Sequence, residues 1–427
     1  MNADTPGGDA DVIIIGGGAA GLATAIFAAR AGVKTGGGPG IVLVDGAKSL
    51  GAKILVSGGS RCNVTNASVE ASDFWRAGSP FVRQVLRAFP VPETVAFFEE
   101  IGVRLKEEPL GKLFPVTNKA RSVLDALMTE ARRVGVEVRT SCRVLDLARE
   151  DSRWRIRASQ GSLSAGRVVL ATGGLSLPKT GSDGAGYAWA GALGHTILPT
   201  VPALEPLTLG GEFHGPLSGV THDASIRVTQ PGGKTLTLRG SLLWTHFGIS
   251  GPLALDASRF VRRSRVDGSP AALAIGFLTD MTAEAADQHL REAVRNAPRQ
   301  NIGTELTRRF GLPQAVAAQL VGHALGRDQA LSKLTREKRK ALVGALTAFR
   351  LDVIDGRGYN FAEATSGGVA LDEVNPKTME SRIVPGLYFV GEILDVDGRI
   401  GGFNFQWAWS TARVAGRALG GNRTGER

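Results

Sequence analysis

Cysteine is nearly absent from this chain of 427 residues, since only Cys62 and Cys142 occur. Two cysteines argue against a disulfide scaffold, a CxxC redox pair and a cysteine zinc cluster. Histidine is also scarce, with six residues and no cluster at metal-ligand spacing. We therefore predict no metal site, and we expect a protein of the reducing cytoplasm.

Long hydrophobic runs and a basic leader are missing as well. The first ten residues are polar and acidic, which argues against a signal peptide. Four glycines interrupt the apolar stretch from Val12 to Ala29, so it resolves into a strand, a turn and a helix, and we predict no membrane contact. The chain length indicates two or three soluble domains.

Acidic residues are fewer than basic ones, and the net charge is +10. Such an excess favours an anionic partner such as a nucleotide, a nucleic acid or an acidic lipid. A merely Arg-rich proteome would give the same bias. Residues 254–350 carry most of the excess, with 16 Lys or Arg against 9 Asp or Glu.

The amino-terminal segment has a glycine turn between two strands. Asp11–Ile15 is a continuous apolar run, Gly16–Gly21 matches G-x-G-x-x-G, and Leu22–Ala31 is an Ala-rich helix. Ile41–Val44 is the second strand and ends at Asp45. The first glycine allows the turn, the second lets the backbone approach a pyrophosphate, and the third lets the helix pack on the strand. This βαβ unit predicts dinucleotide binding, with Asp45 on the adenosine ribose.

Two later segments favour FAD over NAD as that dinucleotide. Val168–Gly174 is a strand that ends in Ala-Thr-Gly, a pattern of glutathione-reductase-like flavoproteins, and Gly386–Glu392 is a strand that reaches an acid. Gly401–Asn404 then precedes a helix whose amino terminus would face the flavin pyrimidine edge, where reduction builds negative charge. The predicted cofactor contacts are Gly16, Gly18, Ala20, Gly21, Asp45, Lys53, Gly58, Gly59, Arg61, Cys62, Ala171, Thr172, Gly173, Gly391, Glu392, Asp397, Gly401, Gly402, Phe403 and Asn404.

Two segments offer candidate catalytic residues. Ser57–Asn66 is small and polar, as expected of a cofactor or substrate loop, in which Arg61 can hold an anion and Cys62 can donate a proton beside the flavin. The alternative for Cys62 is a small packed thiol. His246, in Thr245–Pro252, can act as an acid or a base, although a lone histidine is more often structural.

A basic run lies in the helix-rich window. Arg336, Lys338, Arg339 and Lys340 can contact the phosphate backbone of RNA. The alternative is a solvated helix face, and no RNA-reading motif accompanies the run.

The distribution of strand-like and helix-like segments along the chain predicts a discontinuous α/β fold. A glutathione-reductase-like FAD-binding Rossmann domain takes residues 1–196 and 373–427, with an inserted β domain at 197–253 and 351–372 and an inserted helical domain at 254–350.

Shorter patterns predict further elements. Residues 80–134 favour helices around a loop at Glu107–Asn118, short apolar runs between 136 and 170 favour a β-meander, and a helix is expected from Phe405.

The order of these motifs resembles the bacterial BaiN/YhiN-like flavoproteins, also described as aminoacetone-oxidase-family FAD-binding enzymes or NAD(P)/FAD-dependent oxidoreductases. The resemblance covers nearly the whole chain and implies bound FAD and three domains. It also implies a choice of activities: reduction of activated C=C bonds in steroid-like acids, amine oxidation, or reduction of uridine in ribosomal RNA. The matching segments are Gly16–Gly21, Ser57–Asn66, Thr180–Gly186, Thr245–Pro252, Thr365–Val369, Thr378–Ser381 and Gly391–Gln406.

Three positions depart from the pattern of that family. Asp45 stands where glutamate is commoner, the loop Thr35–Gly40 is longer, and Ser60 replaces one glycine of the usual S-G-G-G-R-C string. Aspartate makes the same ribose contacts, so none of these changes argues against FAD.

We therefore expect a flavin-dependent reductase in which Cys62 or His246 supplies a proton. The chain lacks a second G-x-G-x-x-G, so NADH or NADPH would bind only transiently as the electron donor. Uridine in ribosomal RNA is the leading substrate. A small enone or amine, and a non-enzymatic flavin-bearing redox sensor, are the alternatives.

Overall fold

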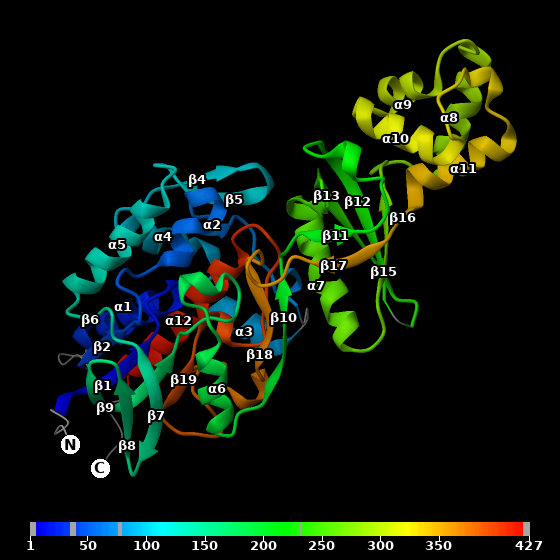
Figure 1. The fold of residues 1–427 in the computed structure, drawn as a ribbon. Helices are drawn as coiled ribbons and strands as arrows, with labels where there is room; N and C mark the ends of the chain where they lie inside the picture. Colours follow the sequence, from blue (N-terminus) through cyan, green and yellow to red (C-terminus); the bar gives the residue numbers. More distant parts are fainter. Residues whose placement is uncertain (1–5, 35–39, 76–78, 231, 422–427) are drawn as a thin grey trace. The chain divides into compact units, whose positions relative to one another are not determined.

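The computed structural model describes residues 6–34, 40–75, 79–230 and 232–421. The chain divides into two compact units, Met1–Thr200 with Glu363–Arg427 and Val201–Ala362 (Figure 1), and each unit has its own hydrophobic core. Both ends of the chain therefore belong to the first unit. The predicted insertion Thr35–Gly40 lies, except for Gly40, outside the described residues.

The sheet of the first unit is parallel at its centre. β1 (Pro6–Ile15) pairs with β2 (Ile41–Val44) and β9 (Gly161–Leu170), and β19 (Leu387–Phe389) pairs with β9. Ile13 and its two neighbours are 0% exposed. A parallel sheet is covered on both faces, which explains the continuous apolar run in the sequence.

Shorter and antiparallel strands complete this sheet. β7 (Val144–Glu150) and β8 (Arg153–Ala158) continue from β9 as an antiparallel meander. β6 (Glu137–Arg139) pairs in parallel with β2 at the opposite edge. The expectation of a meander therefore holds for its last three strands and is wrong for the first.

Two long helices from opposite ends of the sequence pack side by side (Figure 1). α1 (Ala19–Lys34) follows the glycine turn, and α12 (Phe403–Gly421) begins two residues before its predicted start. Added Cβ atoms at Gly416 and Gly420 would lie 2.5 and 2.2 Å from side chains of α1. These two glycines of α12 therefore let the helix axes approach closely.

The segment predicted as a loop at Glu107–Asn118 is instead a β-hairpin. β4 (Leu105–Glu108) pairs antiparallel with β5 (Lys112–Pro115). The sequence of β4 is Leu-Lys-Glu-Glu. Because lysine and glutamate are depleted in strands, this composition did not predict a strand. Other elements of the first unit are α2 (Ala52–Ser60), β3 (Thr65–Asn66), α3 (Pro80–Ala88), α4 (Val91–Glu100), α5 (Ala120–Arg133), α6 (Ala185–Ala192) and β18 (Ala364–Val369).

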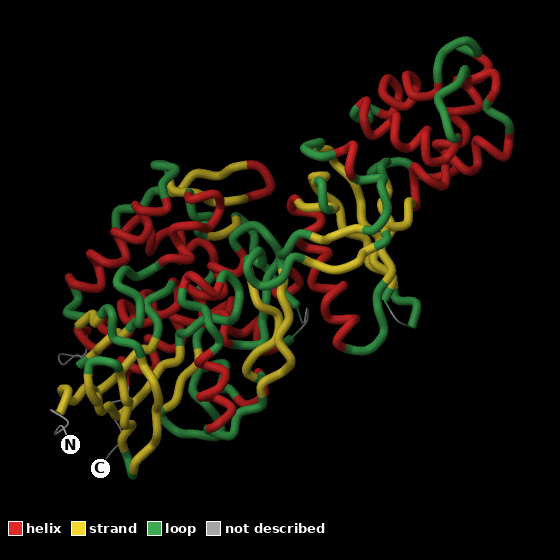
Figure 2. Tube along the Cα trace, in the orientation of Figure 1, coloured by secondary structure: helices red, strands yellow, loops and turns green. Residues whose placement is uncertain are grey.

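The second unit contains an antiparallel sheet and a helical cluster. The sheet has the order β16-β15-β12-β13-β14-β11-β17, and the chain enters the unit along β10 (Ile197–Ala203). The strands are β11 (Leu207–Leu209), β12 (Thr221–Thr229), β13 (Thr235–Thr245), β14 (Gly248–Ser250), β15 (Ala272–Gly276), β16 (Phe349–Leu351) and β17 (Val353–Gly356). The helices are α7 (Gly251–Val266), which packs on β13, and α8 (Ala283–Asn296), α9 (Ile302–Phe310), α10 (Gln314–Leu325) and α11 (Arg336–Ala348), the helical cluster seen in Figure 2.

The window 254–350, expected to be dominated by helices, also contains β15. This strand pairs with β12 inside the sheet, and its sequence is Ala-Leu-Ala-Ile-Gly. Alanine and leucine occur in helices as often as in buried strands, so composition alone did not separate them. The contacts define two units, and the division into three domains stays a prediction.

Candidate functional site

The glycine turn after β1 has one open position between two crowded ones. An added Cβ at Gly16 would lie 2.4 Å from the carbonyl oxygen of Ala171, and one at Gly21 would lie 1.9 Å from that of Gly16. At Gly18 an added Cβ meets nothing within 4 Å. The outer glycines are thus required by the fold, whereas the middle one leaves space into which a pyrophosphate fits.

Asp45 is fixed at the end of β2. Its Oδ2 accepts a hydrogen bond from the Gly17 amide at 2.7 Å, and its Oδ1 accepts one from the Ala47 amide at 2.7 Å. Each carboxylate oxygen can accept a further bond, because two oxygens offer about four acceptor sites. The half-buried side chain can therefore take the ribose hydroxyls predicted for it.

The end of β9 presents the predicted Ala171-Thr172-Gly173 segment to this turn. The Thr172 hydroxyl is buried and has no hydrogen-bond partner among the described residues. Buried polar groups in native structures are nearly always paired, so this orphaned hydroxyl fits a site that binds a polar ligand.

The segment after β19 also reaches the glycine turn. Gly391 has φ 75°, and an added Cβ there would lie 2.8 Å from the Cβ of Ala20. Its amide donates to the hydroxyl of Thr411 at 3.0 Å, and its carbonyl accepts from the indole of Trp407 at 3.1 Å. Both partners lie on α12, which therefore fixes the predicted residues Gly391 and Glu392 against α1.

Lys53 and Glu392, both predicted cofactor residues, form an ion pair. Lys53 Nζ lies 2.9 Å from Glu392 Oε2 and donates to the Ser176 hydroxyl at 2.8 Å. Glu392 Oε1 accepts from the Ser176 hydroxyl at 2.8 Å and from the Thr365 amide at 2.9 Å. The sequence did not point to Ser176, and it pointed to Thr365 only as part of the segment Thr365–Val369 that resembles the related flavoproteins.

The loop before α12 is fixed by the predicted substrate or cofactor loop. The Asn66 side-chain amide donates to the carbonyl of Gly401 at 3.1 Å. An added Cβ at Gly402 would lie 2.5 Å from the backbone of Thr65. Residues near both ends of the chain therefore hold the amino terminus of α12, which carries the positive end of a helix dipole.

The other predicted residues of this segment lie in the same turn. The side chain of Asn404 accepts from the Gly398 amide at 2.8 Å and donates to the carbonyl of that residue at 3.1 Å. Phe403 is buried as the first residue of α12. Asp397 is 0% exposed, and its carbonyl accepts from the Trp75 amide at 2.7 Å.

Ser57–Asn66 contains an unusual left-handed turn. Gly58, Gly59 and Ser60 have φ values of 54°, 66° and 65°. Glycine adopts this conformation without strain, whereas other residues rarely do. Ser60 and Cys62, which has φ 61°, are therefore the strained residues of this segment.

Cys62 is enclosed by protein. Its side chain is 0% exposed. Burial raises the pKa of its thiol to about 12, although a hydrogen bond with Ser57 acts to lower that pKa. The thiol stays protonated at neutral pH and is covered by its neighbours. This environment supports the packed-thiol interpretation, and the proton-donor role stays a prediction.

Arg61 is already paired with protein groups. Its guanidinium carbon lies 4.1 Å from the centroid of the Phe114 ring, and Nη1 lies 3.0 Å from both carboxylate oxygens of Glu108. The hairpin of β4 and β5 supplies both partners. An anion at Arg61 would therefore compete with Glu108.

His246 belongs to the second unit, whereas Cys62 belongs to the first. The imidazole is exposed on the turn between β13 and β14 and lies edge-on to the ring of Phe247, with 5.1 Å between centroids.

A buried Ser-His-Glu arrangement in the first unit was not predicted. His195 Nδ1 lies 3.1 Å from Glu373 Oε2, and Nε2 lies 2.8 Å from the hydroxyl of Ser381. That hydroxyl also accepts from the amides of Ile383 and Val384. A nucleophilic serine needs an accessible oxygen, but Ser381 is 7% exposed and its oxygen is occupied. The three side chains therefore hold the carboxy-terminal segment in place.

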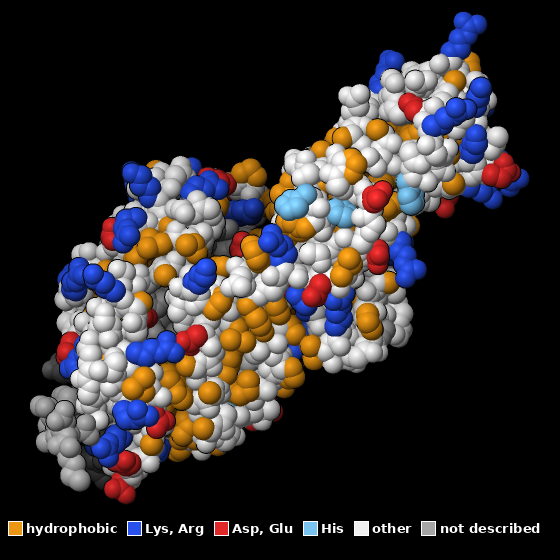
Figure 3. Space-filling view, in the orientation of Figure 1, with side chains coloured by type: hydrophobic (Ala, Val, Ile, Leu, Met, Phe, Trp, Pro, Cys, Tyr) orange, Lys and Arg blue, Asp and Glu red, His pale blue; other side chains and the backbone are white. Residues whose placement is uncertain are grey.

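Only part of the basic run at the start of α11 faces outward. Arg336 and Lys340 are exposed and Lys338 is half-buried. Arg339 instead pairs with Asp287 on α8, at 2.6 Å between Nε and Oδ1, and its side chain is 14% exposed. Among the four predicted RNA contacts, Arg339 is therefore engaged within the helical cluster. Figure 3 shows further Lys and Arg side chains over this cluster.

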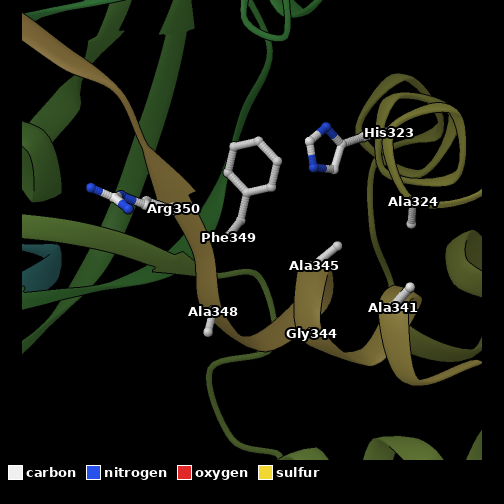
Figure 4. Close-up of a pocket in the computed structure, with 8 residues that line it drawn as sticks. All are labelled: His323, Ala324, Ala341, Gly344, Ala345, Ala348, Phe349 and Arg350. Carbon is white, nitrogen blue, oxygen red and sulfur yellow. The ribbon is translucent and has the colours of Figure 1, made fainter. Parts of the chain in front are cut away.

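A groove of ≈ 390 Å³ lies between the helical cluster and β16 (Figure 4). Ala341, Gly344 and Ala348 of α11 line it together with His323 and Phe349, whose ring centroids lie 4.9 Å apart. None of the predicted site residues lines it.

Within the described ranges, no group of three or more His, Cys, Asp or Glu residues is arranged to hold a metal ion. None of the helices in those ranges is long and apolar enough to cross a membrane.

The comparisons with known proteins agree with the motifs and the fold. The family described as HI0933-like protein Rossmann domain matches residues 10–418. The 3-dehydro-bile acid delta(4,6)-reductase of Clostridium scindens is 34% identical over 95% of this chain and 98% of its own length. The ribosomal RNA dihydrouridine synthase of Escherichia coli is 34% identical over 96% of this chain and 98% of its own length. That of Haemophilus influenzae is 31% identical over 94% of this chain and 96% of its own length. The chain therefore belongs to the HI0933-like Rossmann family of FAD-dependent oxidoreductases, as its motifs predicted.

Proposed function

We propose that this chain is an FAD-dependent reductase that converts uridine to dihydrouridine in ribosomal RNA, in the cytoplasm, with NADH or NADPH as transient electron donor. One observation carries the proposal: the open position at Gly18 lies among the end of β9, Asp45 and the Gly391 segment, all within one unit. Relatives that are named ribosomal RNA dihydrouridine synthases support the choice of substrate.

The residues of the first unit fit the parts of FAD. Gly18 would admit the pyrophosphate, Asp45 would accept from the ribose hydroxyls, and Thr172 would gain a partner for its buried hydroxyl. The amino terminus of α12, held at Gly402, would favour negative charge on the ligand. When bound, FAD would supply a hydride to an activated C=C bond.

The pair of Lys53 and Glu392 would position these segments. Lys53 neutralises the carboxylate, and Ser176 and Thr365 fix its orientation. Because four segments of the chain meet at this carboxylate, its loss would loosen the loop after β9 and the segment after β19 together.

Addition of hydride to a C=C bond also requires a proton. We propose His246 and Cys62 as the two donors to test. The exposed imidazole of His246 is reachable from solvent, whereas the thiol of Cys62 is enclosed and holds its proton strongly. Replacing each by a residue of similar size separates them.

Charge favours RNA over a small substrate. Residues 201–362 contain 20 Lys or Arg and 14 Asp or Glu, and the whole chain has a net charge of +10. A polyanion gains from this excess at every phosphate, whereas a singly charged acid gains little. A small conjugated enone remains the second candidate, because the bile acid reductase is as similar to this chain as the RNA enzyme is.

Mass spectrometry of ribosomal RNA nucleosides from a strain that lacks the gene tests the substrate. Dihydrouridine should disappear and return with the wild-type gene, but not with a Gly18→Ala variant. Unchanged dihydrouridine in the deletion strain would refute the RNA substrate. NADPH oxidation by purified holoprotein with an enone, in the absence of RNA, would then favour the second candidate.

A further inference from the structure

The second unit exposes an arginine that is held by two phenylalanine rings. The guanidinium carbon of Arg357 lies 3.7 Å from the ring centroid of Phe361 and 4.5 Å from that of Phe247. Arg357 follows β17, and Phe247 lies on the turn between β13 and β14, next to His246. Phe361 is 46% exposed. Ring faces attract a guanidinium, so the two rings fix the orientation of the cation.

A buried carboxylate anchors the loop that carries Arg357. Glu205 is 0% exposed, pairs with Arg262 and accepts from the amide of Gly358. The Arg357 amide donates to the carbonyl of Pro206 at 3.1 Å. A ligand would therefore meet a side chain that is already ordered, which reduces the entropy lost on binding.

Among the described residues, no hydrogen bond or ion pair partner is found for the guanidinium of Arg357, whose side-chain contacts are the two phenylalanine rings. Two other arginines that lie on phenylalanine rings differ, since Arg61 pairs with Glu108, and Arg399 pairs with Asp73 at 2.9 Å. Arg413, which lies on the rings of Phe27 and Phe89, is half-buried, whereas Arg357 is exposed to solvent. Arg357 thus keeps all five side-chain N–H donors of a fixed, planar cation. Stability does not account for such a group as readily as ligand binding does.

We propose that Arg357, Phe361 and Phe247 form a binding site for an unpaired segment of RNA. Arg357 donates to a phosphate oxygen, because a guanidinium matches phosphate geometry. The partly exposed ring of Phe361 stacks on a neighbouring base, and stacking of this kind accepts any base. Side chains reach RNA bases where they are unpaired. This inference rests on the proposed function, for which it names a contact with the substrate.

Binding of a short oligouridylate to the holoprotein, followed by fluorescence anisotropy over a series of salt concentrations, tests the site. Loss of one stacked base weakens binding about tenfold, so we expect this effect for Phe361→Leu, with an unchanged salt dependence. Arg357→Ala should weaken binding similarly and also lower the slope of log K against log salt by about 0.7, because one phosphate contact is lost. Arg357→Lys should restore the slope but not the full affinity, since lysine lacks the planar fork.

The matched control is Arg227→Ala, which removes the same charge from an exposed position on β12 of the same unit. It should change the affinity less than Arg357→Ala does. Equal weakening by both variants would reduce the effect to net charge and overturn the site. Wild-type affinity in Arg357→Ala and Phe361→Leu would overturn it directly. Equal Arg357-dependent binding of polyglutamate or phosphatidylserine vesicles would also overturn the assignment to RNA.

The binding assay and the nucleoside analysis fail independently. If the deletion strain keeps its dihydrouridine while oligouridylate binding depends on Arg357, the proposed reaction is wrong and the RNA site stands. If dihydrouridine is lost in the deletion strain and the affinity for oligouridylate is unchanged by substitution of Arg357 and Phe361, the proposed reaction stands and this site is wrong.

Discussion

Alanine substitutions at the three glycines of the amino-terminal turn should separate the needs of the fold from those of the cofactor. At Gly16 and Gly21 an added Cβ falls 2.4 and 1.9 Å from backbone oxygens, whereas at Gly18 it meets no protein atom within 4 Å. Gly16 also has φ 110°, which alanine rarely adopts, and Gly18 is not among the residues with positive φ. The first two substitutions should therefore damage the protein itself, and the third should damage only ligand binding.

The magnitudes follow from these contacts. Forcing extra atoms into a packed site costs roughly 1–3 kcal/mol, so Gly16→Ala and Gly21→Ala should lower the Tm of the FAD-free protein by about 2–12 °C. Gly18→Ala should leave the free energy of unfolding unchanged or raise it by about 0.4–1 kcal/mol, because alanine restricts the unfolded chain. Its methyl group would occupy the space of the pyrophosphate and weaken FAD binding about 5- to 150-fold.

Circular dichroism melts of the FAD-free proteins and fluorescence titrations with FAD measure the two effects separately. Gly322→Ala, an open helical position in the second unit, is the matched control and should leave FAD affinity unchanged. Wild-type FAD affinity in Gly18→Ala would refute the pyrophosphate assignment. A Tm for Gly18→Ala as low as that of Gly21→Ala would refute the distinction between open and crowded positions.

Three further predictions concern buried side chains. The Cys62 thiol should resist iodoacetamide at pH 8 in the native protein and react after denaturation, because it is enclosed and its pKa is about 12; rapid native labelling seen by mass spectrometry would contradict this. Burial lowers the pKa of His195 against the opposing charge of Glu373, so the folded protein binds this proton less readily than the unfolded chain. The urea midpoint should therefore fall as pH drops from 8 to 5, and fall less in His195→Gln. Arg262 keeps a second carboxylate partner in Asp355, at 2.5 Å, so Glu205→Ala removes buried hydrogen bonds but not the whole ion pair; it should lower the free energy of unfolding by about 1–3 kcal/mol in urea titrations, with a smaller loss for Glu205→Gln.

Local patterns predicted the amino-terminal strand, glycine turn, helix and second strand well because the constraints on them are local. The contact that demands glycine at position 21 is with residue 16, and Asp45 accepts from Gly17 across a single βαβ unit. Spacing along the sequence encodes both. The predicted second strand is also confirmed, since β2 begins at Ile41 and ends at Val44 as expected.

The partners of the charged side chains could not be predicted from the sequence, because they come from distant segments of the chain. Lys53 pairs with Glu392, which lies 339 positions away in the sequence, and no local pattern around either residue predicts this contact. Arg61 was expected to hold an anion, but a hairpin concealed by its lysines and glutamates supplies Glu108. Long-range pairs of this kind depend on the assembled sheet, whereas a glycine turn depends on its own backbone.

The enclosure of Cys62 bears on how the reaction could obtain its proton. A general acid works best when its pKa lies near the working pH. With a pKa of about 12, the buried thiol gives up its proton much less readily at neutral pH than such an acid does. Burial thus favours the packed thiol over the proton donor, and it makes His246, whose side chain is exposed, the substitution to test first.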